Sequence, residues 1–374
     1  MTFRTPMLRR LAVLCVLAAM LVAATGCTAL KNGTDKPDAG APGDLGADLG
    51  IVWTDLGIAE WDLGQPIADQ GVPPVDLGVP DFGSPDVGPR CAPTPRMTAA
   101  TWARYPLPDT AGHPRSYQLR GTWPYQTEID CVTGLEWQRT VGAASYTQAE
   151  AITYCDDLEL AGYTDWQLPS TIELMTLVDY TVPDPGPVID TDAFPGTPAA
   201  IFWSSSSAAG MSSKGWFVHF ANGFSSHDDV SMIAGHARCV RGDGLGGTPV
   251  GAPSGHFTDL LDGTVHDNLT TLVWQTGHSS VTQSQAEAGT YCAMLALAGS
   301  APWRLPTVLE LRSLVDESRS APSIDVAYFL DTPAERFWSS TPVPGGTYGT
   351  FVDFGYGTTS FYEVATPFLA RCVR

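Results

Sequence analysis

The sequence repeats itself once, and this repeat limits the possible folds more than any other feature of the chain. A tryptophan-centred segment at 135–138 (Leu-Glu-Trp-Gln) returns at 272–275 (Leu-Val-Trp-Gln), and Trp137 and Trp274 stand 137 positions apart. Three further pairs of segments follow in the same order: 166–169 with 303–306, 202–205 with 337–340, and 239–241 with 372–374. Because each copy has its own set of tryptophans and a late cysteine, the chain is predicted to fold as two tandem modules.

Both copies contain the same signals for the start of a helix. A Ser or Thr followed three residues later by Glu forms a capping box, in which the two side chains satisfy free backbone N–H groups at a helix N-terminus. The four pairs are Thr147 with Glu150, Ser170 with Glu173, Ser284 with Glu287, and Thr307 with Glu310. Each module is therefore predicted to have two helices. We expect the first to end near Gly162 or Gly299 and the second near Val178 or Val315.

Strands are predicted in the second half of each copy. After the second helix comes an irregular loop of about 20 residues that is rich in Pro and Asp. The segments 216–220 and 350–354 are then rich in aromatic and β-branched residues, which is typical of paired strands joined by a turn. This order of elements predicts an α+β fold, with two helices and a small antiparallel sheet in each module.

Six cysteines lie outside the N-terminal segment, and their positions suggest three disulfides. Each module has one cysteine on its first predicted helix and one on its last strand. The predicted pairs are Cys155–Cys239, Cys292–Cys372 and Cys91–Cys131. Each of the first two would close a loop of about 80 residues and stabilise the fold by about 4 kcal/mol. A zinc site is disfavoured, because no Cys-x-x-Cys pair occurs.

Residues 1–27 have the pattern of an export signal. Three arginines precede an apolar stretch at 11–22, which is too short to predict a membrane span. The next segment, 24–27 (Ala-Thr-Gly-Cys), resembles the lipobox of bacterial lipoproteins, which implies cleavage before Cys27 and lipid attachment to its sulfur. Because Thr28 rather than Asp follows, the resemblance implies the outer membrane. The alternative is an ordinary signal peptide, cut nearby, that leaves Cys27 free.

Residues 28–90 differ in composition from the rest of the chain. Asp-Leu-Gly occurs five times between positions 44 and 78, and no Lys or Arg lies between Lys36 and Arg90. Gly and Pro interrupt regular structure and the aspartates repel one another, so this segment is predicted to be a disordered spacer. The aspartates could ligate Ca²⁺, but the segment has no Asp-x-Asp-x-Asp-Gly loop, which favours the spacer.

The whole chain is acidic, with a formal net charge of −20. Nucleic acid is excluded as a partner, because phosphates are bound by clustered Lys and Arg. Docking on anionic membranes through charge is disfavoured for the same reason, so membrane contact is expected through the lipid. The predicted organisation is a signal peptide at 1–26, a tether at 27–90, a first module with an N-terminal extension at 91–243, a linker at 244–254 and a second module at 255–374.

The shared motifs resemble the Lcl C-terminal domain family, also known as DUF1566. Its pattern includes a Gly-Leu-x-Trp, an aromatic-Arg-Leu-Pro, an aromatic-Trp-Ser-Ser and a terminal Arg-Cys-Val-Arg. The residues that carry it here, with the tryptophans expected in the core, are Trp137, Trp166, Leu168, Pro169 and Trp203, then Trp274, Trp303, Arg304, Leu305, Pro306 and Trp338. The first copy departs from it with Gln167 in place of the arginine. The resemblance implies C-type-lectin-like modules, a fold also related to formylglycine-generating enzymes.

No motif for catalysis is present in the sequence. His-Glu-x-x-His, Gly-x-Ser-x-Gly and a phosphate-binding glycine loop are all absent. His219, His227 and His236 could gather around zinc, but Asp353 occupies the first of these positions in the second copy, which favours structural histidines. No catalytic residue, metal site or cofactor is therefore predicted. An enzyme of the formylglycine-generating type is the third choice among the functions, because the cysteines are assigned to structural bridges.

The lectin-like resemblance implies a non-enzymatic binding or adhesion protein, with a glycan, peptidoglycan or protein ligand. The family's named member binds sulfated glycosaminoglycans, but sulfate is bound by basic residues and this chain is acidic overall, so that ligand is not expected here. The Glu-Pro-Asn and Trp-Asn-Asp motifs of calcium-dependent lectins are also absent, so Ca²⁺ is not expected. Trp216, which has Thr350 opposite it in the second copy, is the single candidate ligand contact. The alternative is an envelope-assembly lipoprotein without a small ligand. The oligomeric state is left open.

Overall fold

A computed structural model describes residues 117–374, apart from residues 184, 242–252 and 300–301. The chain divides into two units, Met1–Val79 and Pro80–Arg374, and all the described residues belong to the second. The predicted signal peptide, tether, lipidated Cys27 and Cys91 therefore lie outside the described residues. The predicted boundaries of the modules stay predictions, since the 242–252 segment between the copies is not described. Module 1 below means the described residues up to Arg241, and module 2 those from residue 253 onward.

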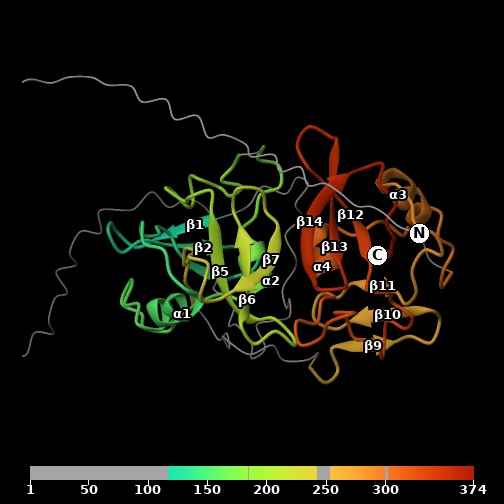
Figure 1. The fold of residues 1–374 in the computed structure, drawn as a ribbon, viewed down its shortest axis with the longest axis horizontal. Helices are drawn as coiled ribbons and strands as arrows, with labels where there is room; N and C mark the ends of the chain where they lie inside the picture. The colour runs from blue at the N-terminus through green and yellow to red at the C-terminus, as the bar shows by residue number, and fades with distance from the viewer. Residues whose placement is uncertain (1–116, 184, 242–252, 300–301) are drawn as a thin grey trace, which may run out of the picture. The chain divides into compact units, whose positions relative to one another are not determined.

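Module 1 contains a five-stranded antiparallel sheet and a three-stranded ribbon (Figure 1). The sheet has the order β1-β2-β3-β8-β4, from Tyr117–Arg120, Thr127–Asp130, Glu136–Gln138, Val240–Arg241 and Trp166–Gln167. The ribbon is formed by β5 (Ile201–Ser207), β6 (Lys214–His219) and β7 (Ser225–Asp229). The helices are α1 (Gln148–Asp156) and α2 (Thr171–Met175).

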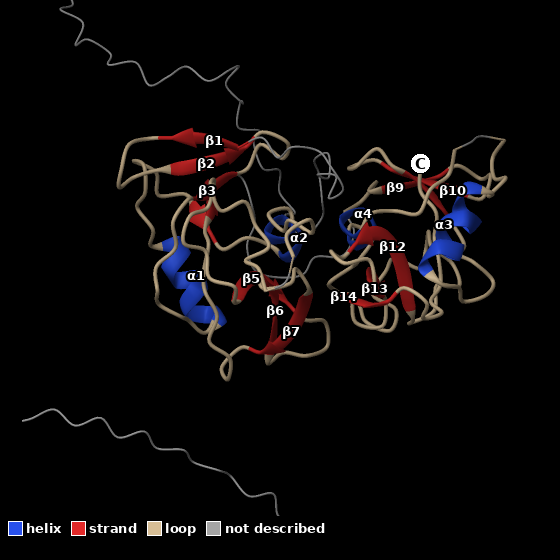
Figure 2. Cartoon of the chain, turned by 90° about the horizontal axis from the view of Figure 1, so that it is seen from above, coloured by secondary structure: helices blue, strands red, loops and turns tan. Residues whose placement is uncertain are grey.

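Module 2 repeats this arrangement. Its first sheet has the order β11-β10-β9, from Val273–Gln275, Thr264–Asp267 and Phe257–Asp259. Its ribbon is β12 (Arg336–Pro342), β13 (Tyr348–Asp353) and β14 (Thr358–Glu363), and its helices are α3 (Gln285–Ala293) and α4 (Val308–Arg312). Bridges from Val373 to Trp274 and Arg304 take the place of the β3-β8-β4 pairing in module 1. Figure 2 shows these short helices and strands joined by long loops. The predicted α+β fold with two tandem antiparallel modules is confirmed.

The four predicted capping boxes are all present at the helix N-termini. The predicted helix ends are wrong. Helix α1 ends at Asp156, and Gly162 lies beyond a further turn with a φ of 79°, so it is not the residue that ends the helix. Helix α2 ends at Met175, not Val178, because Leu177 and Val178 form tighter turns to Leu174 and Met175. Both residues are fully buried, which is why their apolar pattern resembled a longer helix.

The two ribbons join into one six-stranded sheet with the order β12-β13-β14-β7-β6-β5. Strands β14 and β7 meet at the pair Thr359 and Ser225, which are equivalent positions in the two copies. The Ser225 backbone N–H donates to Thr359 Oγ1 at 2.8 Å, and the two hydroxyls are 2.9 Å apart. Both residues are buried, so this junction belongs to the interior of the protein.

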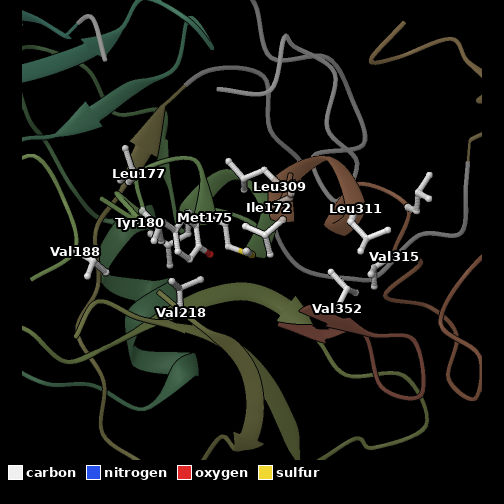
Figure 3. Close-up of a cluster of buried hydrophobic side chains, with 14 of the residues drawn as sticks. Ile172, Met175, Leu177, Tyr180, Val188, Val218, Leu309, Leu311, Val315 and Val352 are labelled. Atoms are coloured by element: carbon white, nitrogen blue, oxygen red, sulfur yellow. The ribbon is translucent and has the colours of Figure 1, made fainter. Parts of the chain in front are cut away.

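The largest hydrophobic cluster also contains residues of both modules. Figure 3 shows Ile172 and Met175 of module 1 in the same cluster as Leu309, Leu311 and Val315 of module 2. Helices α2 and α4 are in contact at this point. Because burying such side chains stabilises a fold by about 1.5–3 kcal/mol each, the modules share a substantial part of their core. No helix in the described part of the chain is long and apolar enough to cross a membrane.

Candidate ligand site

The disulfides Cys155–Cys239 and Cys292–Cys372 are confirmed. Their Cα atoms are 5.4 and 5.3 Å apart, and the bridges span 84 and 80 residues. All four cysteines are fully buried in apolar clusters, which makes them structural rather than reactive. Cys131 is also disulfide-bonded, but its predicted partner Cys91 lies outside the described residues.

The six motif tryptophans belong to the core, as predicted. Trp137, Trp166, Trp203, Trp274, Trp303 and Trp338 are each at most 2 % exposed. The Leu-Pro segments connect the second helix to the ribbon, since the carbonyls of Pro169 and Pro306 accept hydrogen bonds from Ser205 N and Ser340 N. Arg304 forms a two-point ion pair with Glu310, at 2.7 and 2.6 Å. The family motif therefore maintains the fold rather than forming a binding surface.

Trp216 does not contact solvent, which corrects its assignment as the candidate ligand contact. The side chain is 2 % exposed, and the guanidinium of Arg312 from module 2 lies 5.0 Å from its ring centroid. The ring of His227 packs edge-on against it at 5.1 Å. Trp216 is thus specific to module 1 because it supports the contact between modules. In the sequence alone, this difference between the copies resembles that of a ligand contact, because the neighbouring module is not visible there.

The three histidines considered for zinc have separate structural roles. His219 stacks on Phe224, His227 packs on Trp216, and His236 lies against Phe202. Burial lowers the pKa of His219, and burial followed by the charge of Lys214 lowers the pKa of His227. Within the described ranges, no group of three or more His, Cys, Asp or Glu residues could hold a metal ion.

The serine run in β5 is likewise structural. Ser204 Oγ donates to the Trp216 carbonyl at 3.0 Å and lies 3.1 Å from the Thr171 hydroxyl. Ser204 and Ser206 are fully buried. A nucleophilic serine needs a base within hydrogen-bond reach, and the bonds made by Ser204 are instead to a backbone carbonyl and another hydroxyl.

An open cavity of about 320 Å³ lies in module 2, where β12 begins and β13 ends. Its lining consists of Thr282, Ala334, Glu335, Arg336, Asp353, Pro367, Phe368 and Leu369. Charged residues form part of the rim, while Phe368 and Leu369 are mostly buried beneath. This volume is at the lower end of the range for ligand sites, about 300–1,000 Å³.

The guanidinium of Arg336 is held in place from two sides. Arg336 Nε donates to Asp353 Oδ2 at 3.3 Å, and the guanidinium carbon lies 5.1 Å from the Phe351 ring and 5.6 Å from the Phe368 ring. Asp353 is fixed in turn, because its Oδ1 accepts from Gly355 N at 2.8 Å. The terminal nitrogens of Arg336 and the carboxylate of Glu335 have no hydrogen-bond partner among the described residues. Both side chains are exposed, so these groups are accessible to a ligand.

The corresponding place in module 1 has different chemistry. Ile201 pairs with His219 in the same register in which Arg336 pairs with Asp353. Gly235 takes the place of Phe368, as the matching bridges Tyr146–Gly235 and Gln283–Phe368 show. A Cβ atom on Gly235 would lie 3.0 Å from the Trp203 ring, so a phenylalanine does not fit there without rearrangement. The sequence motifs do not point to these positions. The signal that was present is that the two copies differ at three places within otherwise matching segments.

The fold and site thus define an α+β protein of two tandem, disulfide-closed antiparallel modules, one of which has a charged surface cavity. The sequence profile of the Lcl C-terminal domain matches residues 126–241 and 263–374, one match in each module. The chain belongs to the Lcl C-terminal domain family. A comparison with curated proteins found no match.

Proposed function

We propose that this chain is a non-enzymatic envelope lipoprotein that displays two C-type-lectin-like modules for binding or adhesion, with a glycan, peptidoglycan or protein as the ligand. A lipid on Cys27 would anchor it in the outer membrane, and the acidic segment after it would separate the modules from the bilayer. The lectin-like assignment is supported by the position of the disulfides, each of which connects the first helix of a module to its last strand region.

The observation that carries the binding function is the cavity of module 2. It combines an oriented guanidinium with the carboxylates of Glu335 and Asp353, which are polar groups of the kind that orient a ligand in a small site. A catalytic role has less support. The buried cysteines form disulfides, and the buried Ser204 hydroxyl bonds to a backbone carbonyl and a threonine.

The test is a binding screen with the full-length protein, purified in a detergent that has no sugar head group. The probes are a printed glycan array and soluble peptidoglycan fragments, each with and without Ca²⁺. We expect saturable binding to a restricted set of probes, unchanged by Ca²⁺. Failure to bind either type of probe, together with in-cell cross-linking that captures only envelope proteins, would instead support the assembly lipoprotein.

A further inference from the structure

We propose that the cavity of module 2 binds a saccharide through its hydroxyl groups, and that one chain has one such site. This inference rests on the proposed binding function and makes it more specific. It assigns the ligand contacts to Arg336, Asp353 and Glu335, with Phe368 holding Arg336 in place. It assigns to module 1 a supporting role, without a matching site.

The mixture of charges at the rim selects the ligand class. An inorganic anion drawn to Arg336 would lie beside the carboxylates of Glu335 and Asp353, which repel it. A simple cation drawn to the carboxylates would lie beside the guanidinium. A hydroxyl group can bind the carboxylates and the guanidinium at once, because it donates to a carboxylate and accepts from a guanidinium. Neighbouring hydroxyls on a sugar ring provide several such groups within the reach of one small cavity.

The side chain of Arg336 is also preorganised for binding. Arg336 is confined by the Phe351 and Phe368 rings and by Asp353, so little further side-chain entropy is lost when its terminal nitrogens bind a ligand. The Phe368 ring packs against Trp338 and Phe351 and is only 8 % exposed, so it serves to hold Arg336 in place rather than to contact the ligand.

Module 1 lacks each of these parts. Ile201 provides no donor in place of Arg336, and Gly235 provides no aromatic ring in place of Phe368, which holds Arg336 in module 2. The Nδ1 atom of His219 is already used, since it accepts from Ala221 N at 3.1 Å. The tandem repeat therefore does not give two equal saccharide sites. We expect a stoichiometry of one per chain and no gain from bivalency within a chain.

The experiment measures binding of free glucose, galactose and N-acetylglucosamine to the full-length protein by saturation-transfer NMR and calorimetry. The test variant is R336I with D353H, which gives module 2 the residues of module 1. Histidine can maintain the turn bond of Asp353, as His219 does in module 1. The control is H219D, which exchanges one of the two equivalent residues of module 1. Folding of each variant is checked by near-UV circular dichroism.

The expected result is weak binding of at least one sugar with one site per chain. Affinity should fall at least about tenfold in the double variant and stay unchanged in H219D. Two sites per chain, or undiminished binding in the double variant, would overturn this inference while leaving the broader binding function in place. Peptidoglycan or protein binding without binding of any sugar would overturn the saccharide assignment alone. The absence of binding to every probe, including the array, would overturn both.

Discussion

Arg312 is a buried charge at the boundary between the modules, and its neighbours explain how it is tolerated. Its guanidinium pairs with the buried carboxylate of Glu317 and lies over the ring of Trp216. The equivalent residues in module 1 are Met175 and Tyr180, so an ion pair in one copy takes the place of an apolar and an aromatic residue in the other. Burying two charges is costly unless each has its partner.

Arg312→Met should therefore destabilise the protein strongly, because it leaves Glu317 buried without its partner. We expect a loss of about 3–5 kcal/mol in the free energy of unfolding, measured by urea denaturation. The double variant R312M and E317Y should recover most of this loss. In module 1 the hydroxyl of Tyr180 donates to the Gly223 carbonyl at 2.8 Å, and Gly357 provides the equivalent carbonyl in module 2. Equal instability of the single and double variants would contradict this account of the ion pair.

His227 should make the stability of the protein depend on pH. Its pKa lies below the ordinary value of 6.5, first because the side chain is buried and next because the positive charge of Lys214 is near. The negative charge of Asp228 raises the pKa, but by less. Below pH 6.5 the unfolded chain then binds more protons than the folded protein, so stability is full above that pH and falls as the pH drops through the lower folded pKa. His219 contributes in the same direction.

His227→Phe, which introduces the residue of module 2 at this position (Phe361), should reduce the loss of stability on acidification. Thermal unfolding midpoints measured between pH 7 and pH 5 test this, around the histidine value of about 6.5. His219→Phe is measured in parallel and should reduce the loss by its own share, which separates the contributions of the two histidines. An identical pH profile for wild type and H227F would show that His227 does not contribute.

At the scale of helices and strands, local signals in the sequence predicted where a helix begins better than where it ends. A capping box depends on two side chains three residues apart, so Thr147 with Glu150 is visible in the sequence and present in the structure. The end of α2 depends on turns in which Leu177 and Val178 remain buried, and an apolar pattern does not distinguish such turns from a helix. Strand β7 (Ser-Ser-His-Asp-Asp) has no apolar alternation, because its residues after Ser225 are only partly buried.

Thr359→Val should weaken the junction between β7 and β14. It removes the acceptor of the buried Ser225 N–H and the contact between the two hydroxyls, with an expected cost of about 1–3 kcal/mol in stability. Ser225→Ala removes only the hydroxyl contact and should cost less. A double-mutant cycle in urea measures the coupling between the two positions, and a coupling energy of zero would show that the junction does not stabilise the protein.

At the scale of the whole molecule, the repeat predicted two modules but not that they share a core. The sequence motifs describe what is common to the copies, whereas the contact between them depends on residues that differ, such as Trp216 and Arg312. The cavity was missed for the same reason. Arg336, Asp353 and Phe368 come from separate segments, and only the fold brings them to one place.

The anchor can be tested on the complete protein. We expect Cys27→Ala to prevent lipid attachment, so that the protein moves from the membrane fraction to the soluble fraction. Metabolic labelling with a fatty acid, followed by cell fractionation and mass spectrometry of the mature N-terminus, provides the measurement. Thr28→Asp serves as the control for sorting, because it should retain the lipid and change the membrane in which the protein is found. Labelling of the Cys27→Ala variant would contradict the assignment.

The contact between Ser225 and Thr359 has a consequence for how such a protein can diversify. Two identical subunits meeting at equivalent positions must accept every substitution twice, once on each side of their symmetry axis. When both halves belong to one polypeptide, a substitution appears once. One half can then acquire a bulky indole and the other the cation that covers it, as Trp216 and Arg312 do. The same freedom allows Arg336 and Asp353 to appear in one half while the other retains Ile201 and His219. Fusion turns a symmetric pair into two halves that can specialise.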